Sequence, residues 1–327
     1  MEFRRLGETV MNLSIIGFGA WAIGGKRNAT GWWELGPADD ALSLAAIHRA
    51  IDRGVNWIDT APGYGLGHSE EIIGKSIRGM HDRPYVFTKC GYVWSDDRVV
   101  TNNISTASIG KEVDDSLRRL GLDSIDLYQI HGVSPENDHL IDQAWEALFR
   151  LKEQGKVVHI GVSNFNVARL QRIQSIAAVE TLQASYSLLD RSIEDETLPY
   201  CQRRNIGTIA YSPMQTGLLS GSITRTRMDA MASDDARRFN PNFKEPLLTV
   251  NLGRVERLRH LATEWNTDPG HIAVAWTLRS TLVTGAIVGF KSPAQVDEMM
   301  ADEYFELSDA QLDAIEAIGW TDFVERS

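Results

Sequence analysis

Cysteine, long apolar runs and an excess of basic charge are scarce or missing in this chain of 327 residues. Cys90 and Cys201 are its only cysteines, which excludes a disulfide framework and favours a reducing compartment, the cytoplasm. No stretch approaches the roughly 20 apolar residues of a membrane span, and no apolar run of signal-peptide type follows Met1 to Arg5. The formal net charge of -11 argues against nucleic acid and anionic membranes as partners.

Of two common signals of ligand binding, one is missing and the other is incomplete. The histidines show neither H-x-H nor H-E-x-x-H spacing, so no metal site is predicted. The segment Gly17 to Ala22 matches the relaxed dinucleotide fingerprint G-x-G-x-x-G/A. That fingerprint needs a helix to begin there, and the chain continues instead through a glycine-rich stretch that we predict as loop. We therefore reject a Rossmann-type site.

The pattern that is present is a regular alternation of strands and helices. After a predicted hairpin over Phe3 to Val10, strands are expected at 13–18, 55–58, 85–89, 125–130, 157–162, 181–184, 207–211 and 286–288. Apolar residues at helical spacing follow each of them. Eight such units favour a closed (β/α)8 TIM barrel with an N-terminal β-hairpin and extra helices and loops at the C-terminal face. We expect a single domain over 1–327.

Polar side chains stand where three of these strands end. Asp59 ends the second strand, Lys89 the third and His131 the fourth, and Tyr64 lies in the Gly/Pro-rich loop after Asp59. In a barrel of this kind these ends share one face. We expect Lys89 to pair with Asp59 and to lower the pKa of Tyr64, so that Tyr64 exchanges a proton near neutral pH.

Seven short stretches, in order over nearly the whole chain, resemble the aldo-keto reductase superfamily. They are Asn56 to Gly65, His68 to Gly74, Thr88 to Lys89, Asp126 to His131, Gly161 to Phe165, Tyr211 to Pro213 and Gly217 to Gly221. The pattern is most similar to the bacterial branch with general-stress oxidoreductases and glycerol-dehydrogenase-type enzymes. The resemblance places the family's catalytic tetrad on Asp59, Tyr64, Lys89 and His131.

The resemblance also implies a nicotinamide cofactor, bound without a Rossmann domain. It assigns the cofactor carboxamide to Ser163, Asn164 and Gln183. It assigns stacking on the nicotinamide ring to Tyr211. The residues that it places beside the pyrophosphate are Ser212, Pro213 and Leu218.

The run from Gly289 to Glu298 resembles the family's adenosine segment, with contacts at Gly289, Lys291, Gln295 and Glu298. Lys291 would pair with a 2′-phosphate beside the helix that Pro293 begins, so NADP(H) is preferred. Relatives often carry asparagine directly after the position of Glu298, where this chain has Met299. NAD(H) therefore stays open as an alternative.

Tryptophans and arginines mark two further regions. Trp21 and Trp94, in loops after the first and third strands, are expected to wall the substrate pocket, and Trp21 also to contact the cofactor. Trp32 and Trp33 share the loop of Trp21. The segment 222–245 is expected to be a solvated loop, with a lid that grips cofactor phosphates as the alternative. Its arginines are Arg225, Arg227, Arg237 and Arg238.

Together these residues predict hydride transfer between the nicotinamide and a carbonyl or alcohol carbon, with small polyols such as glycerol among the substrates. Tyr64 would act as the general acid or base. One alternative is a cofactor-binding, redox-sensing regulatory subunit with slow turnover, like the channel-associated β subunits of the superfamily. Another is a metal-dependent barrel hydrolase. The sequence identifies no protein partner.

Overall fold

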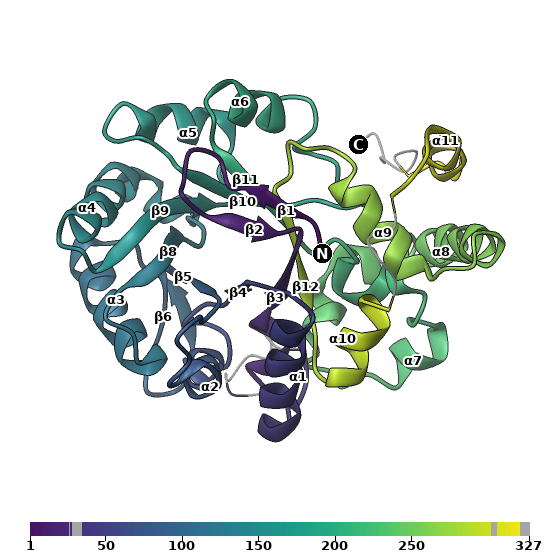
Figure 1. The fold of residues 1–327 in the computed structure, drawn as a ribbon, viewed down its shortest axis with the longest axis horizontal. Coiled ribbons are helices and arrows are strands. Elements are labelled where there is room, and N and C mark those ends of the chain that lie inside the picture. Colours follow the sequence, from purple (N-terminus) through teal and green to yellow (C-terminus); the bar gives the residue numbers. More distant parts are fainter. Residues whose placement is uncertain (26, 28–34, 302–305, 321–327) are drawn as a thin grey trace.

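The centre of the structure, a computed structural model that describes residues 1–25, 27, 35–301 and 306–320, is a closed barrel of parallel strands (Figure 1). The barrel strands are β3 (Ile16–Gly19), β4 (Trp57–Asp59), β5 (Tyr85–Cys90), β8 (Ile125–Ile130), β9 (Val157–Ser163), β10 (Thr181–Ser185), β11 (Gly207–Tyr211) and β12 (Gly285–Gly289). They follow one another around the barrel in chain order, and β12 pairs with β3 to close it. The predicted (β/α)8 barrel is confirmed.

Helices surround the barrel (Figure 1). They are α1 (Asp40–Asp52), α2 (His68–Ile77), α3 (Thr106–Leu120), α4 (Ile141–Glu153), α5 (Val167–Gln174), α6 (Thr197–Arg203), α7 (Arg225–Asp229), α8 (Leu247–Glu264), α9 (Pro269–Leu278), α10 (Pro293–Met299) and α11 (Asp309–Glu316). Short 3-10 turns are η1 (Ala20–Ile23), η2 (Pro135–Leu140), η3 (Gln215–Ser220), η4 (Ala236–Phe239) and η5 (Pro241–Phe243). No helix in the described ranges is long and apolar enough to cross a membrane.

Local capping chemistry explains where several helices begin and end. The side chains of Asp39, Ser105 and Asn166 accept backbone N–H bonds at the starts of α1, α3 and α5, which satisfies donors that a helix leaves unpaired. Gly121 ends α3 in the left-handed region at φ 66°, a conformation that glycine adopts without strain. Directly after β3, the described residues Ala20–Ile23 form the short 3-10 turn η1, so the fingerprint-like segment lacks the α-helix that it would need to begin there.

The N-terminal hairpin differs from its predicted extent. Its strands are β1 (Phe3–Arg5) and β2 (Asn12–Ser14), which pair in antiparallel fashion from Phe3 opposite Ser14. Leu13, expected to begin the first barrel strand, therefore belongs to the hairpin, and the barrel strand begins at Ile16. Both segments are apolar and adjacent, so the pattern alone does not separate them.

This hairpin closes one end of the barrel. Its residues Leu6, Met11 and Leu13 are buried and pack with side chains from the barrel interior. Those interior partners are Trp57, Phe87, Leu127, Ile209 and Ile287. The Arg4 guanidinium donates to the carbonyl oxygens of Leu278 and Val283 at 3.0 and 2.9 Å, which ties the hairpin to the end of α9. The barrel interior is therefore a packed core rather than a channel.

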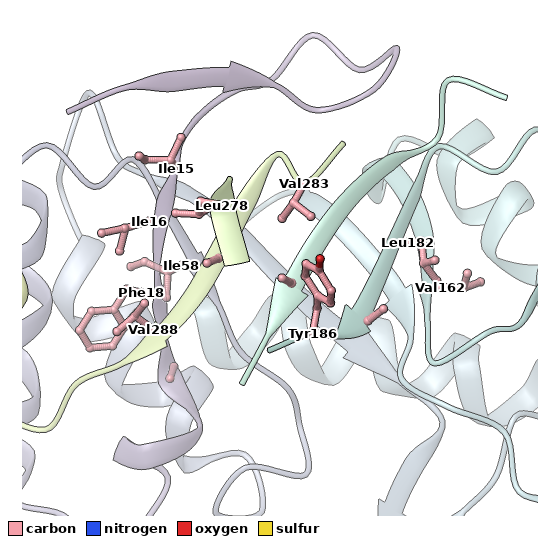
Figure 2. Close-up of a cluster of buried hydrophobic side chains, with 14 of the residues drawn as sticks. Ile15, Ile16, Phe18, Ile58, Val162, Leu182, Tyr186, Leu278, Val283 and Val288 are labelled. Carbon is pink, nitrogen blue, oxygen red and sulfur yellow. The ribbon is translucent and has the colours of Figure 1, made fainter. Parts of the chain in front are cut away.

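A second and larger core lies between the strands and the surrounding helices. Phe18, Ile58 and Val288 sit on neighbouring strands, where Phe18 is opposite both of the others in the strand register. Figure 2 shows these side chains close together, with Val162 and Leu182 on the far side of the cluster. Because both faces of every barrel strand are covered, the strands are almost continuously apolar, as parallel strands usually are.

The segment 222–245, expected to be a solvated loop, carries α7, η4 and η5. Ile223, Met228 and Phe243 are buried in a small apolar cluster with Leu218 and Leu248. The polar composition concealed these few anchoring residues. The helix α11, for which the sequence analysis made no prediction, packs on α8 and begins with a capping box at Ser308 and Gln311.

Trp57 fills the barrel interior so closely that it requires glycine beside it. A Cβ on Gly17 would overlap the Trp57 ring, and one on Gly285 would lie 2.9 Å from Trp57 Cζ2. Gly17→Ala should therefore lower the free energy of unfolding by about 1–3 kcal/mol, measured by urea denaturation.

Gly110→Ala is the matched control, because a Cβ at Gly110 in α3 would meet nothing within 4 Å. We expect it to stabilise the protein by up to about 1 kcal/mol, since alanine favours helix. Equal changes in the free energy of unfolding for the two variants would show that the Trp57 ring moves to make room for an added methyl group.

Candidate active site

The barrel brings the four predicted catalytic side chains to one end. Lys89 Nζ lies 2.6 Å from Asp59 Oδ1 and 5.3 Å from the centroid of the Tyr64 ring. The Tyr64 and His131 rings meet edge to face, with centroids 5.7 Å apart. Four groups from separate segments thus lie within contact range at the carboxyl ends of β4, β5 and β8.

Asp59 and Lys89 form a buried ion pair, as expected. Lys89 Nζ also donates to the Thr60 carbonyl oxygen at 2.9 Å, and Gln183 Nε2 donates to Asp59 Oδ2 at 2.7 Å. Burial raises the pKa of Asp59 and lowers the pKa of Lys89, while their mutual attraction opposes both shifts. The additional hydrogen bonds supply partners that a buried charge needs.

Tyr64 corrects one expectation. Its pKa is not lowered by Lys89 but raised well above the ordinary value, because burial disfavours the phenolate and the negative charge of Asp59 opposes it. Burial and the charge of Lys89 hold the pKa of His131 well below its ordinary value. At neutral pH the protein therefore presents a protonated phenol beside a neutral imidazole.

A glycine contact sets the position of the Tyr64 loop. Gly65 has φ +61°, and a Cβ there would collide with the Gly24 carbonyl group. Only glycine allows the backbone after Tyr64 to come this close to the loop after β3. The same loop carries Trp21, whose ring centroid is 6.4 Å from that of Tyr64.

Sequence reasoning missed Tyr92. It lies on the small hairpin of β6 (Tyr92–Trp94) and β7 (Val100–Asn102) that follows β5, and its ring is 5.3 Å from that of His131 at an interplanar angle of 87°. The predicted pocket residue Trp94 stacks with Arg119 of α3, 5.7 Å from ring centroid to guanidinium carbon, and lines the same cavity as Tyr92. Trp32 and Trp33 lie outside the described residues. The signal for Tyr92 was its place three residues after Lys89.

The residues assigned to the nicotinamide lie at the carboxyl ends of β9, β10 and β11. Asn164 Nδ2 donates to the His131 carbonyl oxygen at 3.0 Å and to Ser163 Oγ at 3.1 Å. The Tyr211 hydroxyl donates to Asn164 Oδ1 at 2.7 Å, and Gln183 contacts Asp59. Amide and hydroxyl groups next to an aromatic ring fit a carboxamide on a flat heterocycle, so this donor set suits a nicotinamide.

The residues assigned to the pyrophosphate lie after β11. Ser212 has a left-handed backbone with φ 55°, and Thr216 and Gly217 within η3 also have positive φ. Pro213 is buried between them. Leu218 is fully buried in the small apolar cluster of the segment 222–245, so a contact with a phosphate would come from its backbone and not from its side chain.

The adenosine segment lies at the start of α10. Ser292 caps this helix, and Gln295 Oε1 accepts the Lys291 backbone N–H at 2.7 Å. Lys291 Nζ donates to the Leu35 carbonyl oxygen at 2.6 Å. Burial and the nearby charge of Arg237 lower the pKa of Lys291, and Asp235 opposes the shift.

The other positions in or directly after the adenosine segment are Gly289, Glu298 and Met299. Gly289 and Glu298 are exposed, and Met299 packs on the hydrophobic core.

The arginines of the segment 222–245 are bound to their own segment and its neighbours. Arg237 forms a two-pronged contact with Asp235 at 2.8 and 2.7 Å. Arg238 donates to the carbonyl oxygens of Met228 and Met231. Arg225 pairs with Glu245 at 2.5 Å, and Arg227 donates to the Ser222 carbonyl oxygen at 3.0 Å. Of the four, Arg237 is the one whose charge acts on Lys291.

Two remaining features bear on alternative chemistry. No group of three or more His, Cys, Asp or Glu side chains suited to a metal occurs within the part of the chain that the structure describes. Cys90, next to Lys89, is buried, and burial raises the pKa of its thiol well above the ordinary value. An inert thiol is the expected consequence.

The chain belongs to the Aldo/keto reductase family, which matches residues 15–319. It is 35% identical over 302 residues to aldo-keto reductase YhdN of Bacillus subtilis, covering 91% of this chain and 88% of that protein. It is 35% identical over 316 residues to the NADH-specific methylglyoxal reductase of Escherichia coli, covering 93% and 94%. The aldo-keto reductase yakc [NADP(+)] of Schizosaccharomyces pombe is 30% identical, covering 86% and 83%.

A solved structure agrees with the family assignment. The glycerol dehydrogenase AKR11B4 from Gluconobacter oxydans matches with a TM-score of 0.85 and 33% identity, over 97% of this chain and 94% of that one. The resemblance stated from the motifs is thereby confirmed, and the chain is an oxidoreductase of this family. The expectation of a nicotinamide cofactor, with NADP preferred and NAD open, agrees with relatives named for each nucleotide.

Removing one member of the ion pair should reveal how strongly the pair is coupled. Lys89→Met should lower the free energy of unfolding by about 3–5 kcal/mol, because it leaves the Asp59 carboxylate buried without its cation. The double variant Asp59→Leu/Lys89→Met removes both charges and should recover part of the loss. Urea unfolding measures both. A double variant no more stable than the single one would contradict this account.

Proposed function

We propose that this protein transfers a hydride between a nicotinamide cofactor and the carbonyl or alcohol carbon of a small molecule, with Tyr64 as general acid and base. The observation that carries the proposal is the meeting of Asp59, Tyr64, Lys89 and His131 at the open end of a barrel whose other end is closed by the hairpin.

The protonation states suit reduction of a carbonyl. Tyr64 keeps its proton at neutral pH because of its raised pKa, so it can donate it to the substrate oxygen as negative charge develops there. His131 is neutral and orients the same oxygen by a hydrogen bond. Lys89, held by Asp59, stabilises the phenolate that Tyr64 becomes. In alcohol oxidation the phenolate takes the proton back.

The bound cofactor supplies or accepts the hydride. Ser163, Asn164 and Gln183 would hold its carboxamide and Tyr211 would stack on the ring. We propose NADP(H) as the preferred form because Lys291 stands beside the capped start of α10, with Arg237 as a second nearby cation. NAD(H) remains the alternative, because Met299 occupies the position where relatives often carry asparagine.

The substrate class follows from the named relatives, which act on glycerol and methylglyoxal. Both are small polar molecules with adjacent oxygen-bearing carbons. We propose short aldehydes, ketones and polyols as substrates, bordered by Trp21 and Tyr92, whose rings lie next to Tyr64 and His131.

Tyr64→Phe tests the assigned role. It should reduce kcat by about 10²–10⁴-fold, the usual contribution of a general acid, and leave the Kd for the cofactor within about twofold. Initial-rate assays with a panel of aldehydes measure kcat, and fluorescence titration with the cofactor measures the Kd. Tyr85→Phe is the control, because Tyr85 begins β5, at the opposite end of that strand from Lys89, and this variant should keep its activity.

Retained turnover in Tyr64→Phe would refute the role of this residue. Wild-type protein that binds the cofactor tightly but turns over slowly on every aldehyde, ketone and polyol tested would favour the regulatory-subunit alternative.

Lys291→Ala tests the choice of nucleotide. Loss of a charged contact to a 2′-phosphate should raise the Kd for NADPH about tenfold and that for NADH less than about twofold. Lys244→Ala, an exposed lysine of the neighbouring segment, serves as the control. Equal changes for both nucleotides would show that Lys291 does not contact the 2′-phosphate.

A further inference from the structure

A buried carboxylate outside the tetrad holds the backbone directly after the lysine strand. Glu112 of α3 is 6% exposed. Its Oε2 accepts the Gly91 backbone N–H at 2.9 Å, and its Oε1 accepts the Ser108 hydroxyl at 2.9 Å. The tetrad chemistry makes no use of Glu112. Because burying a carboxylate costs free energy unless its partners compensate, Glu112 is expected to have another role.

Gly91 connects the barrel strand β5 to the β6–β7 hairpin at the active-site end. It follows Cys90, the last residue of β5, and adopts φ +99°, with Ile104 Cγ2 only 2.9 Å from where a Cβ would lie. Its carbonyl oxygen accepts from Asn102 Nδ2 at 2.8 Å and from the Asn103 N–H at 2.9 Å. Both backbone groups of Gly91 are thus bound, the N–H by Glu112 and the carbonyl by the far end of the β6–β7 hairpin.

The hairpin that starts at Gly91 reaches His131. Tyr92, the next residue, places its ring 5.3 Å from the His131 ring. Asn102, at the other end of the hairpin, also donates to the Gly132 carbonyl oxygen at 3.1 Å. The hairpin is therefore connected on both sides to the segment that carries His131, and Glu112 is its anchor on the helix side.

We propose that Glu112 is a positioning residue that fixes the β6–β7 hairpin, and with it Tyr92, against His131 and so determines how tightly the substrate binds. The effect on substrate rests on the proposed function; the anchoring of Gly91 does not. The Glu112 carboxylate bonds to Gly91 and Ser108, so Glu112 acts through the hairpin and is not a catalytic residue.

Ionisable groups from four elements face Glu112. They are Glu70 on α2, Arg119 on α3, Cys90 on β5 and Tyr128 on β8. Burial and the charge of Glu70 raise the pKa of Glu112 to about 7, against the opposing effects of Gly91, Ser108 and Arg119. Glu112 also borders a cavity of about 610 Å³ between α3 and the hairpin. Other charged residues that line it are Asp96, Arg98, Lys111, Asp115, Arg118 and Arg119.

The charge on Glu112 gives the anchor a pH dependence with a definite sign. Above pH 7 the carboxylate accepts the Gly91 N–H in a charge-assisted bond, and below pH 7 protonation weakens that bond. The KM for substrate should therefore be higher below pH 7 than above it. In Glu112→Gln, which keeps the size and an acceptor oxygen but cannot ionise, this step in KM near pH 7 should disappear.

Two variants and a control test the proposal. Glu112→Ala at pH 8 should raise KM about fivefold, the effect of losing one hydrogen bond, with kcat within about twofold. Glu112→Gln should raise KM by less. Asp115→Asn changes a carboxylate one turn further along α3 that lines the same cavity and pairs with Arg118, and should leave KM unchanged.

Amide hydrogen exchange at Gly91 gives a readout that needs no turnover. Exchange should be about fivefold faster or more in Glu112→Ala than in wild type, intermediate in Glu112→Gln and unchanged in Asp115→Asn. If Glu112→Ala does not fold, Glu112→Gln carries both measurements. Unchanged Gly91 exchange, or an unchanged KM with normal turnover, overturns the proposal. Absence of turnover in wild type refutes the proposed function instead, and Gly91 exchange then decides the anchor.

Discussion

The buried ion pair between Asp59 and Lys89 is the constraint on which the active-site end depends. It joins the neighbouring strands β4 and β5 in a place from which water is excluded, where an uncompensated charge would be strongly destabilising. Thr60 and Gln183 complete the hydrogen bonding of the pair. The pair also acts on Tyr64 and His131. In addition to burial, the Asp59 charge raises the pKa of Tyr64 and the Lys89 charge lowers the pKa of His131.

Hydrogen bonds extend this arrangement to the residues assigned to the cofactor. Gln183 links Asp59 to the Asn164 backbone, whose N–H donates to the Gln183 carbonyl oxygen at 3.0 Å. Asn164 in turn contacts the His131 carbonyl oxygen and the Tyr211 hydroxyl. Groups proposed to hold the nicotinamide therefore also hold the catalytic groups in place, so the two functions share one network.

The barrel and the convergence of Asp59, Lys89 and His131 at one of its ends were predictable because each depends on local signals. Alternating strands and helices imply a parallel sheet, and the carboxyl ends of its strands must share a face; Asp59, Lys89 and His131 follow from that rule alone. Tyr92 and the contact of Trp94 with Arg119 depend on how a short hairpin folds over the barrel, which strand ends do not reveal.

The raised pKa of Tyr64 could not be predicted from the sequence for a different reason. Its largest cause is burial, which is a property of the whole fold that the neighbouring residues in the chain do not reveal. The boundary between Leu13 and Ile16 was misplaced for a related reason, because an apolar pattern does not tell a hairpin strand from a barrel strand.

The N-terminal hairpin of β1 and β2, which closes the barrel end opposite the tetrad, limits how ligands reach the site. Since Leu6, Met11 and Leu13 close that end against Trp57, cofactor and substrate in the proposed reaction would reach the tetrad from the opposite end. Because the packed interior leaves no passage through the barrel, both ligands of the proposed reaction would have to pass the same loops at the carboxyl ends of the strands.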